Sequence, residues 1–270
     1  MAGNGGTSMK PVTETRSIIK LAGGNAAQVE DEIVTEYPLT VKLNGEEAVT
    51  MVSSPEYLED MVIGYLASEG FISKLEDIKE IWIQEKEGFA HVTLSKENLI
   101  THMQNKRYLT SCCGMSRPGF VFVNDARVVK PLKQTTAIHA DACFFLMNEL
   151  QRTADIFQST GGVHNAALCD ENGIIVSRMD IGRHNALDKL YGYCLKNAIS
   201  TRGKILVFSG RISSEILLKT AKIGCEIVLS KSAPTTLALN LAEELGITAA
   251  GFIRNSSLNI YTHSNRIKTS

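Results

Sequence analysis

Two adjacent cysteines, Cys112 and Cys113, lie in the segment TSCCGMSRPG, whose polar, Gly and Pro residues predict an exposed loop. An accessible thiolate is a nucleophile, so this pair is the first candidate for chemistry. The other four cysteines lie singly in apolar stretches, where a free cysteine behaves as a small buried hydrophobe: Cys143, Cys169, Cys194 and Cys225. Without a secretory signal, six cysteines in 270 residues indicate reduced thiols rather than a disulfide framework.

Four polar loops form a second group of candidates. TGGVH at 160–164 enters a predicted strand, while 180–185, 209–215 and 230–235 each leave a strand and open a helix. In layered α/β sheets, ligands bind at the carboxyl ends of the strands, where helix N-termini present free N–H groups. These loops carry five basic side chains: His164, Arg183, His184, Arg211 and Lys231. The sequence therefore predicts a pocket for an anionic, nucleotide-like ligand.

Each of these residues also has a simpler explanation. Ser213 and Thr235 could only cap helices, Asp180 could cap the helix that follows it, and His164 or His184 could be hydrogen-bonded core imidazoles. Caps alone, however, would not require so many cationic side chains at the same edge of one sheet. We therefore favour the pocket.

Familiar nucleotide and metal motifs are missing from the sequence. There is no GxxxxGK[ST] and no GxGxxG after a strand, which argues against a P-loop and a Rossmann unit. The deaminase pattern H-x-E with P-C-x-x-C is also absent, because His164 is followed by Asn165-Ala166 and Cys113 is followed three residues later by Ser116. We therefore expect no zinc.

Composition narrows the function classes further. The net charge of -1 provides no bulk electrostatic footprint for nucleic acid or for an anionic membrane surface. No apolar run approaches the roughly 20 residues of a membrane-spanning helix, and the N-terminus has no signal-peptide core. We expect a cytoplasmic protein that binds neither nucleic acid nor membranes.

The predicted elements fall into two domains. Residues 1–25 are expected to be a disordered leader, and 26–104 an α+β domain with a hairpin around Asn44-Gly45. Its helix is expected to start at a Ser54-Pro55 cap and to stop at Gly70, before two strands within 78–95. Residues 105–135, which include the cysteine pair, are expected to be a mobile loop.

Residues 136–270 alternate between short apolar strands and amphipathic helices, beginning with a helix from Thr136 to about Asp155. Two strands with a turn between them follow within 161–180, and three further strand and helix units complete the pattern. This alternation predicts a layered, largely parallel α/β domain.

Several blocks of this sequence resemble the signature blocks of the FdhD/NarQ family, the formate dehydrogenase accessory sulfurtransferases: EYPLTVKLNGEEAVTMVSSPEYLEDMVIGYLASEGFI, TGGVHNAALCD, DIGRHNALDKL, SGRISSEILLK, SKSAPTTLALNLAEELGIT and GFIRNSSLNIYT. The resemblance covers residues from about 30 to 265. It implies a cytidine-deaminase-like C-terminal domain without zinc. It also implies a sulfur carrier that receives persulfide sulfur from a cysteine desulfurase and passes it to the bis-molybdopterin guanine dinucleotide cofactor of formate dehydrogenase.

Carried over to this chain, the family's usual S-C-G-x-C-G motif places its first cysteine at Cys113 and its second at Ser116. A single persulfide on Cys113 suffices for transfer, but a mechanism that needs both motif cysteines would be in doubt unless Cys112, on the other side of Cys113, substitutes for the second. The rival that this departure leaves open is a non-catalytic cofactor-binding chaperone. A small-nucleotide hydrolase is a more distant rival, which the missing ligands disfavour.

The resemblance also implies a contact to the guanine nucleotide moiety from the loop of Phe252, Ile253, Arg254, Asn255, Ser256 and Ser257. Many relatives have a second Arg where this chain has Ser257. Finally, the resemblance implies a homodimer.

Overall fold

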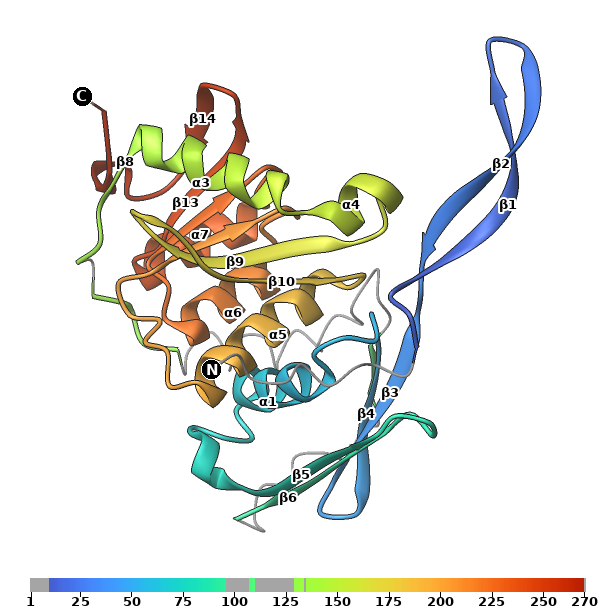
Figure 1. Cartoon of the computed structure of the whole chain (residues 1–270). Helices are drawn as coiled ribbons and strands as arrows, with labels where there is room; N and C mark the ends of the chain where they lie inside the picture. Colours follow the sequence, from blue (N-terminus) through green and yellow to red (C-terminus); the bar gives the residue numbers. More distant parts are fainter. Residues whose placement is uncertain (1–9, 96–106, 110–128, 134, 270) are drawn as a thin grey trace.

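The computed structural model describes residues 10–95, 107–109, 129–133 and 135–269. In this part of the chain, two layered bodies pack together through one pair of helices, and a long hairpin projects from them (Figure 1). The helices and sheets confirm the predicted α/β class. Among the described residues, no helix is both long and apolar enough to cross a membrane.

The smaller body is a five-stranded sheet of order β5-β6-β3-β4-β7 with helix α1 (Leu58–Glu69) on one face. The predicted hairpin is confirmed, because Asn44 and Gly45 adopt the positive φ angles, 49° and 91°, of a tight turn. Gly70 ends α1 with a φ of 81°, also as predicted. The strands of this sheet are β3 (Tyr37–Leu43), β4 (Glu46–Ser53), β5 (Ile78–Gln84), β6 (Phe89–Leu94) and β7 (Arg107–Leu109).

Two details of the smaller body differ from prediction. Ser54 does not cap α1: Tyr57 occupies the cap position without a side-chain bond, because the N–H and hydroxyl of Ser54 donate instead to Asp180 Oδ2, at 2.9 and 3.1 Å. Residues 107–109, expected to be part of a mobile loop, form β7 and pair in parallel with β4. The remainder of that loop, including Cys112 and Cys113, lies outside the described residues.

A disordered leader is wrong for residues 13–22. They form β1 (Thr13–Ala22), which pairs along its whole length with β2 (Asn25–Val34). Most residues of this hairpin are exposed, so it lacks the alternation of buried and exposed positions that reveals a strand in a sequence. β2 pairs with β1 rather than with the five-stranded sheet, which begins only at Tyr37.

The larger body is built on a six-stranded sheet of order β10-β9-β11-β12-β13-β14. β11, β12 and β13 are parallel, whereas β9, β10 and β14 join antiparallel. The expected largely parallel sheet is therefore realised only in the centre, because two hairpins add strands at its sides. The strands are β9 (His164–Asp170), β10 (Gly173–Asp180), β11 (Ile205–Phe208), β12 (Ile227–Ser230), β13 (Thr248–Arg254) and β14 (Ser257–Ile260).

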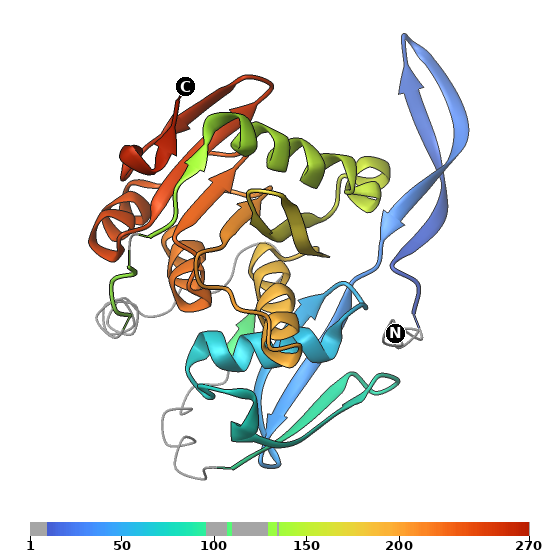
Figure 2. The ribbon, with the colours of Figure 1, turned by 60° about the vertical axis from the view of Figure 1, so that its left-hand side comes forward.

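Helices cover both faces of this sheet (Figure 2). Alternate residues of β11 show the arrangement: Leu206 and Phe208 pack toward one group of helices, and Ile205 and Val207 toward the other. The first face carries α5 (Arg183–Lys196), α6 (Ser214–Ile223) and α7 (Thr236–Leu245). The second carries α3 (Ala140–Arg152), which α4 (Asp155–Thr160) follows.

The predicted helix from Thr136 begins only at Ala140. Thr135 and Thr136 are held by the buried carboxylate of Glu226, which accepts their backbone N–H groups at 2.7 and 2.8 Å. The next two residues, β8 (Ile138–His139), pair with β15 (Ile267–Lys268) near the end of the chain. These contacts extend the segment and delay the helix.

The two bodies meet where α1 crosses α5. A Cβ atom on Gly192 would lie 1.8 Å from the carbonyl oxygen of Asp60, and one on Gly64 would lie 1.9 Å from that of Asp188. The helices are therefore in backbone contact, which only glycine allows. Charged groups surround this crossing, including the ion pair of Arg178 with Asp60 at 3.3 Å.

Candidate functional site

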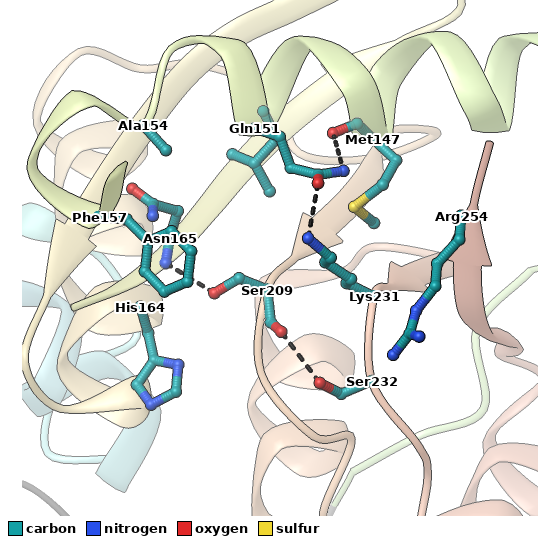
Figure 3. Close-up of a pocket in the computed structure, with 11 residues that line it drawn as sticks. Met147, Gln151, Ala154, Phe157, His164, Asn165, Ser209, Lys231, Ser232 and Arg254 are labelled. Atoms are coloured by element: carbon teal, nitrogen blue, oxygen red, sulfur yellow. Dashed lines mark hydrogen bonds between the residues drawn. The ribbon is translucent and has the colours of Figure 1, made fainter. Parts of the chain in front are cut away.

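A cavity of about 240 Å³ opens at the edge of the larger sheet where β11, β12 and β13 end. The start of β9 reaches the same edge, because β9 runs antiparallel to β11. The cavity is lined by Met147, Leu150, Gln151, Ala154, Phe157, His164, Asn165, Ser209, Lys231, Ser232 and Arg254 (Figure 3). This is the sheet edge at which the sequence predicts a ligand.

Hydrogen bonds between the strand-end loops build the floor of the cavity. Ser209 Oγ accepts the backbone N–H of Asn165 at 2.9 Å, and the Ser209 carbonyl accepts the hydroxyl of Ser232 at 3.2 Å. Ser230 Oγ donates to the Gly210 carbonyl at 2.7 Å. Three successive loops are thus fixed to one another before any ligand binds.

Gly210 lets the loop after β11 approach its neighbours closely. A Cβ atom there would lie 2.9 Å from the ring of Phe208 and 3.3 Å from Nδ1 of His164. Any larger residue would displace one of these two rings. Glycine therefore keeps the imidazole at the cavity wall.

Two cationic side chains reach the cavity from neighbouring strands. Lys231 Nζ donates to Gln151 Oε1 at 2.7 Å, which ties the loop after β12 to helix α3. Arg254 is exposed at the end of β13, and Figure 3 shows its guanidinium directed toward Ser232. An irregularity in β13 positions it: Phe252 has a φ of 53°, and its N–H donates to the Ser232 carbonyl at 3.3 Å. The pair forms a positively charged side of the cavity.

His164 contributes a neutral imidazole to the cavity near pH 7. Burial lowers the pKa of its imidazole from 6.5, and the positive charge of Arg183 lowers it further, whereas Asp180 opposes the shift. Near pH 7 the ring is therefore uncharged, with one nitrogen able to donate a hydrogen bond and the other able to accept one.

The opposite wall is apolar and comes from the helical layer. Met147 and Leu150 belong to α3, and Phe157, which is 41% exposed, belongs to α4. The sequence predicts a helix here but not its place over the sheet edge, because helical periodicity gives a buried face and not its partner. Gln151, on the same helix, was missed for the same reason.

The structure brings together only part of the predicted site. His164, Lys231 and Arg254 line the cavity. Arg183 and His184 begin α5 beside His164, but His184 Nε2 lies 3.0 Å from a carboxylate oxygen of Glu215 and neither residue lines the cavity. Arg211 is exposed and also does not line it.

In the 252–257 loop, Arg254 alone lines the cavity. Ile253 is 1% exposed and packs in the core beneath α3, since successive residues of a strand point to opposite faces. Asn255 and Ser256 form the exposed turn between β13 and β14, and Ser257 opens β14. Ser209 and Ser232 were not singled out from the sequence, although both stand in the predicted polar loops. Asn165, which lies outside those loops as the second residue of β9, was also missed.

The simpler explanations hold for two residues. Ser213 Oγ accepts the N–H of Ile216 and caps α6, and Thr235 caps α7 in the same way through Ala238. Asp180 does not cap α5, because Gly182 occupies the N-cap position without a side-chain bond. Instead, Asp180 Oδ1 accepts the Gly182 N–H at 2.7 Å, while its Oδ2 binds Ser54 of the smaller body.

The four described cysteines are buried and free, as predicted: Cys143, Cys169, Cys194 and Cys225. Burial raises the pKa of Cys143 and Cys169 to about 12 and that of Cys194 to about 11, and it also raises the pKa of Cys225. None of the four is therefore a thiolate near pH 7. Cys112 and Cys113, which lie outside the described residues, stay the sequence-based candidates for nucleophilic sulfur chemistry.

The model of the FdhD/NarQ family matches residues 34–268. The chain belongs to the FdhD/NarQ family. It is 53% identical over 262 residues to the sulfur carrier protein FdhD of Shouchella clausii, covering 96% of this chain and 98% of that protein. The sulfur carrier protein FdhD of Bacillus subtilis is also 53% identical, over 95% of this chain and 98% of its own length.

A solved structure supports the same fold. A candidate formate dehydrogenase accessory protein from Desulfotalea psychrophila superposes with a TM-score of 0.77 at 23% identity, over 96% of this chain and all of that one. The FdhD/NarQ match begins at Val34, the last residue of β2, so the β1–β2 hairpin precedes the part that the family model describes.

Proposed function

We propose that the protein is a cytoplasmic sulfur carrier of the FdhD type. It accepts sulfur from a cysteine desulfurase as a persulfide on Cys113 and transfers it to the bis-molybdopterin guanine dinucleotide cofactor of formate dehydrogenase. The observation that carries the proposal is the cavity at the sheet edge, with Lys231 and Arg254 on one side and an apolar wall on the other, in a chain that is about half identical to named sulfur carriers.

The lining of the cavity suits one nucleotide end of such a cofactor. Lys231 and Arg254 provide cations for phosphate oxygens, and Phe157 provides an exposed aromatic face for a base. At about 240 Å³ the cavity is smaller than the roughly 300–1,000 Å³ of pockets that enclose a whole drug-sized ligand. We therefore assign it to the guanine nucleotide moiety and not to the entire cofactor.

The loading step is a thiol–persulfide exchange. The thiolate sulfur of Cys113 attacks the outer sulfur of the donor's persulfide, a new S–S bond forms, the donor's S–S bond breaks, and the donor's thiolate leaves. No net oxidation or reduction occurs. Ser116 stands where the family's second motif cysteine would be, so this step uses a single thiol.

The protein is further proposed to act as a homodimer.

The alternative function is a chaperone that binds the cofactor without carrying sulfur, and Ser116 favours that alternative. Complementation of formate dehydrogenase activity in cells that lack their own family member separates the two. We expect Cys113→Ala to abolish activity while Cys112→Ala, the matched neighbour, retains it. Full activity of Cys113→Ala would instead support the chaperone.

A further inference from the structure

Asn165 is a polar residue on the face of β9 that packs against the apolar helical layer. Successive residues of a strand point to opposite faces, and Ala167, two residues further along β9, is completely buried in the core beneath α3. Asn165 is 9% exposed and lines the cavity together with Met147 and Phe157 of the helical wall. An apolar side chain is expected at such a position, so the amide requires an explanation.

Hydrogen bonds fix the backbone of Asn165 but leave its side-chain amide available in the described part of the chain. The Asn165 N–H donates to Ser209 Oγ at 2.9 Å, and the Asn165 carbonyl accepts the N–H of Ser209 at 3.0 Å. The side-chain amide has no hydrogen bond to any described residue, although a polar group shielded from water normally has a partner. Its donor and its acceptor are therefore held at the cavity wall for a ligand.

The second amide in the lining, that of Gln151, is already engaged. Its Oε1 accepts the ammonium of Lys231 at 2.7 Å, and its Nε2 donates to the Met147 carbonyl at 3.2 Å. The backbone carbonyl of Gln151 accepts the side-chain amide of Gln158 at 2.7 Å. Of the two amides among the described lining residues, that of Asn165 is thus the one that can bind a ligand.

Asn165 lies at the end of the cavity that suits a base. Figure 3 shows Phe157 and Asn165 at one end and Arg254 at the other, with Lys231 between them. The exposed ring of Phe157 offers a face on which a base can stack, whereas the two cations suit phosphate oxygens. A stacked base carries its polar atoms along its edge, where the Asn165 amide can bind them.

The amide matches one part of a guanine edge. A carboxamide presents a donor and an acceptor side by side. Guanine presents O6, an acceptor, next to N1–H, a donor, so Nδ2 of Asn165 can donate to O6 while Oδ1 accepts from N1–H. The 2-amino group of guanine is a further donor, which a carboxylate could accept, but no described residue of the lining is Asp or Glu. Hypoxanthine, which lacks only that amino group, offers the same two contacts.

We propose that Asn165 determines the base specificity of the cavity: it binds O6 and N1–H of a 6-oxopurine and does not use the 2-amino group. The inference rests on the proposed assignment of this cavity to the guanine nucleotide moiety. It names the residue that holds the base, and it predicts that a hypoxanthine nucleotide binds as well as a guanine nucleotide.

Isothermal titration calorimetry of the full chain with GDP and with inosine diphosphate, IDP, tests the proposal. We expect the parent protein to bind the two nucleotides with dissociation constants within about threefold of each other. Asn165→Leu should weaken both about tenfold, because two neutral hydrogen bonds to the base are lost. Inorganic pyrophosphate, which has no base, should bind Asn165→Leu and the parent protein equally.

Exchange of the amide for a carboxylate provides a second readout. Both oxygens of the carboxylate in Asn165→Asp accept, so they match N1–H and the 2-amino group of guanine but only N1–H of hypoxanthine. We expect this variant to prefer GDP over IDP by about tenfold, because hydrogen bonds to an ionised acceptor are the stronger ones. Asn172→Asp, in the exposed turn at the other end of β9, is the matched control and should keep the ratio of the parent protein.

Two outcomes would overturn the role of Asn165 alone: a parent protein that prefers GDP over IDP by about tenfold or more, or Asn165 variants that bind both nucleotides as the parent protein does. If Asn165→Leu also loses pyrophosphate, the ratio measured for Asn165→Asp decides. A parent protein that binds neither nucleotide would overturn the proposed nucleotide cavity as well. Sulfur loading of Cys113 is measured separately and does not depend on either result.

Discussion

Asp180 and Lys189 form a fully buried ion pair, with Oδ2 and Nζ 2.7 Å apart and neither side chain exposed to solvent. Lys189 Nζ also donates to the hydroxyl of Ser54 at 2.7 Å, so the pair joins the larger body to the smaller one. Asp180 stands directly opposite His164 in the β9–β10 ladder and holds the Gly182 N–H at the start of α5. The contact between the bodies is thereby linked to one side of the cavity.

Breaking this pair should destabilise the fold strongly. Lys189→Met leaves a buried carboxylate without its countercharge, and we expect a loss of about 3–5 kcal/mol in the free energy of unfolding. The control is Asp170→Asn, which removes a partly exposed pair with Lys204 at 3.0 Å and should cost at most about 1 kcal/mol. Urea denaturation measures both, and equal effects would show that burial of the Asp180 pair has no special weight.

At the α1–α5 crossing, we expect replacement of glycine by alanine to lower the stability of the fold instead of raising it. In an open helix, Gly→Ala stabilises by roughly 0.5–1 kcal/mol. Gly192→Ala should instead destabilise, because its Cβ atom would lie 1.8 Å from the Asp60 carbonyl oxygen and the helices would have to separate. Thermal unfolding measures the sign. An unchanged or higher melting temperature would show that the two bodies do not meet as described.

Local signals predicted much of the smaller body. Asn44-Gly45 and Gly70 fix a turn and a helix end through their own backbone preferences, and both were confirmed. Ser54 was misread, because a distant carboxylate, Asp180, competes for the groups that would cap α1. The β1 strand was missed because it has no buried face within one chain.

From the lining of the cavity, we expect Lys231 to bind the phosphates of a nucleotide. Lys231→Met should weaken GDP binding about tenfold or more, because a charge-assisted hydrogen bond to phosphate contributes roughly 1.5–3 kcal/mol. Arg211→Gln is the matched control, since Arg211 lies outside the cavity lining, and it should change affinity less than about twofold. Isothermal titration calorimetry measures both. Equal losses would place the phosphates elsewhere.

Because the pKa of His164 is lowered by folding, we expect the stability of the protein to depend on pH. Its pKa is lowered in the folded protein, so the unfolded chain binds more protons as the pH falls below about 6.5. The free energy of unfolding should therefore fall between about pH 7.5 and pH 5.5, and His164→Gln should reduce that fall. Urea denaturation at both pH values tests this. An identical fall in the two proteins would assign the effect to other groups.

For the site, the sequence predicted the sheet edge better than the individual contacts. Lys231 follows the carboxyl end of β12, and His164 begins β9, which runs antiparallel to β11 and so starts at the same edge. The alternation of β13 turns Ile253 into the core, and the apolar wall depends on where α3 crosses the sheet. Both depend on tertiary packing, which motif spacing does not contain.

The central claim is tested most directly by locating the sulfur. The protein is incubated with a cysteine desulfurase and cysteine, and intact mass and peptide mapping then identify the loaded residue. We expect one added sulfur atom on Cys113, no loading of Cys113→Ala, and normal loading of Cys112→Ala, while the buried cysteines stay unmodified. Loading of Cys113→Ala as complete as that of the parent protein would contradict the account.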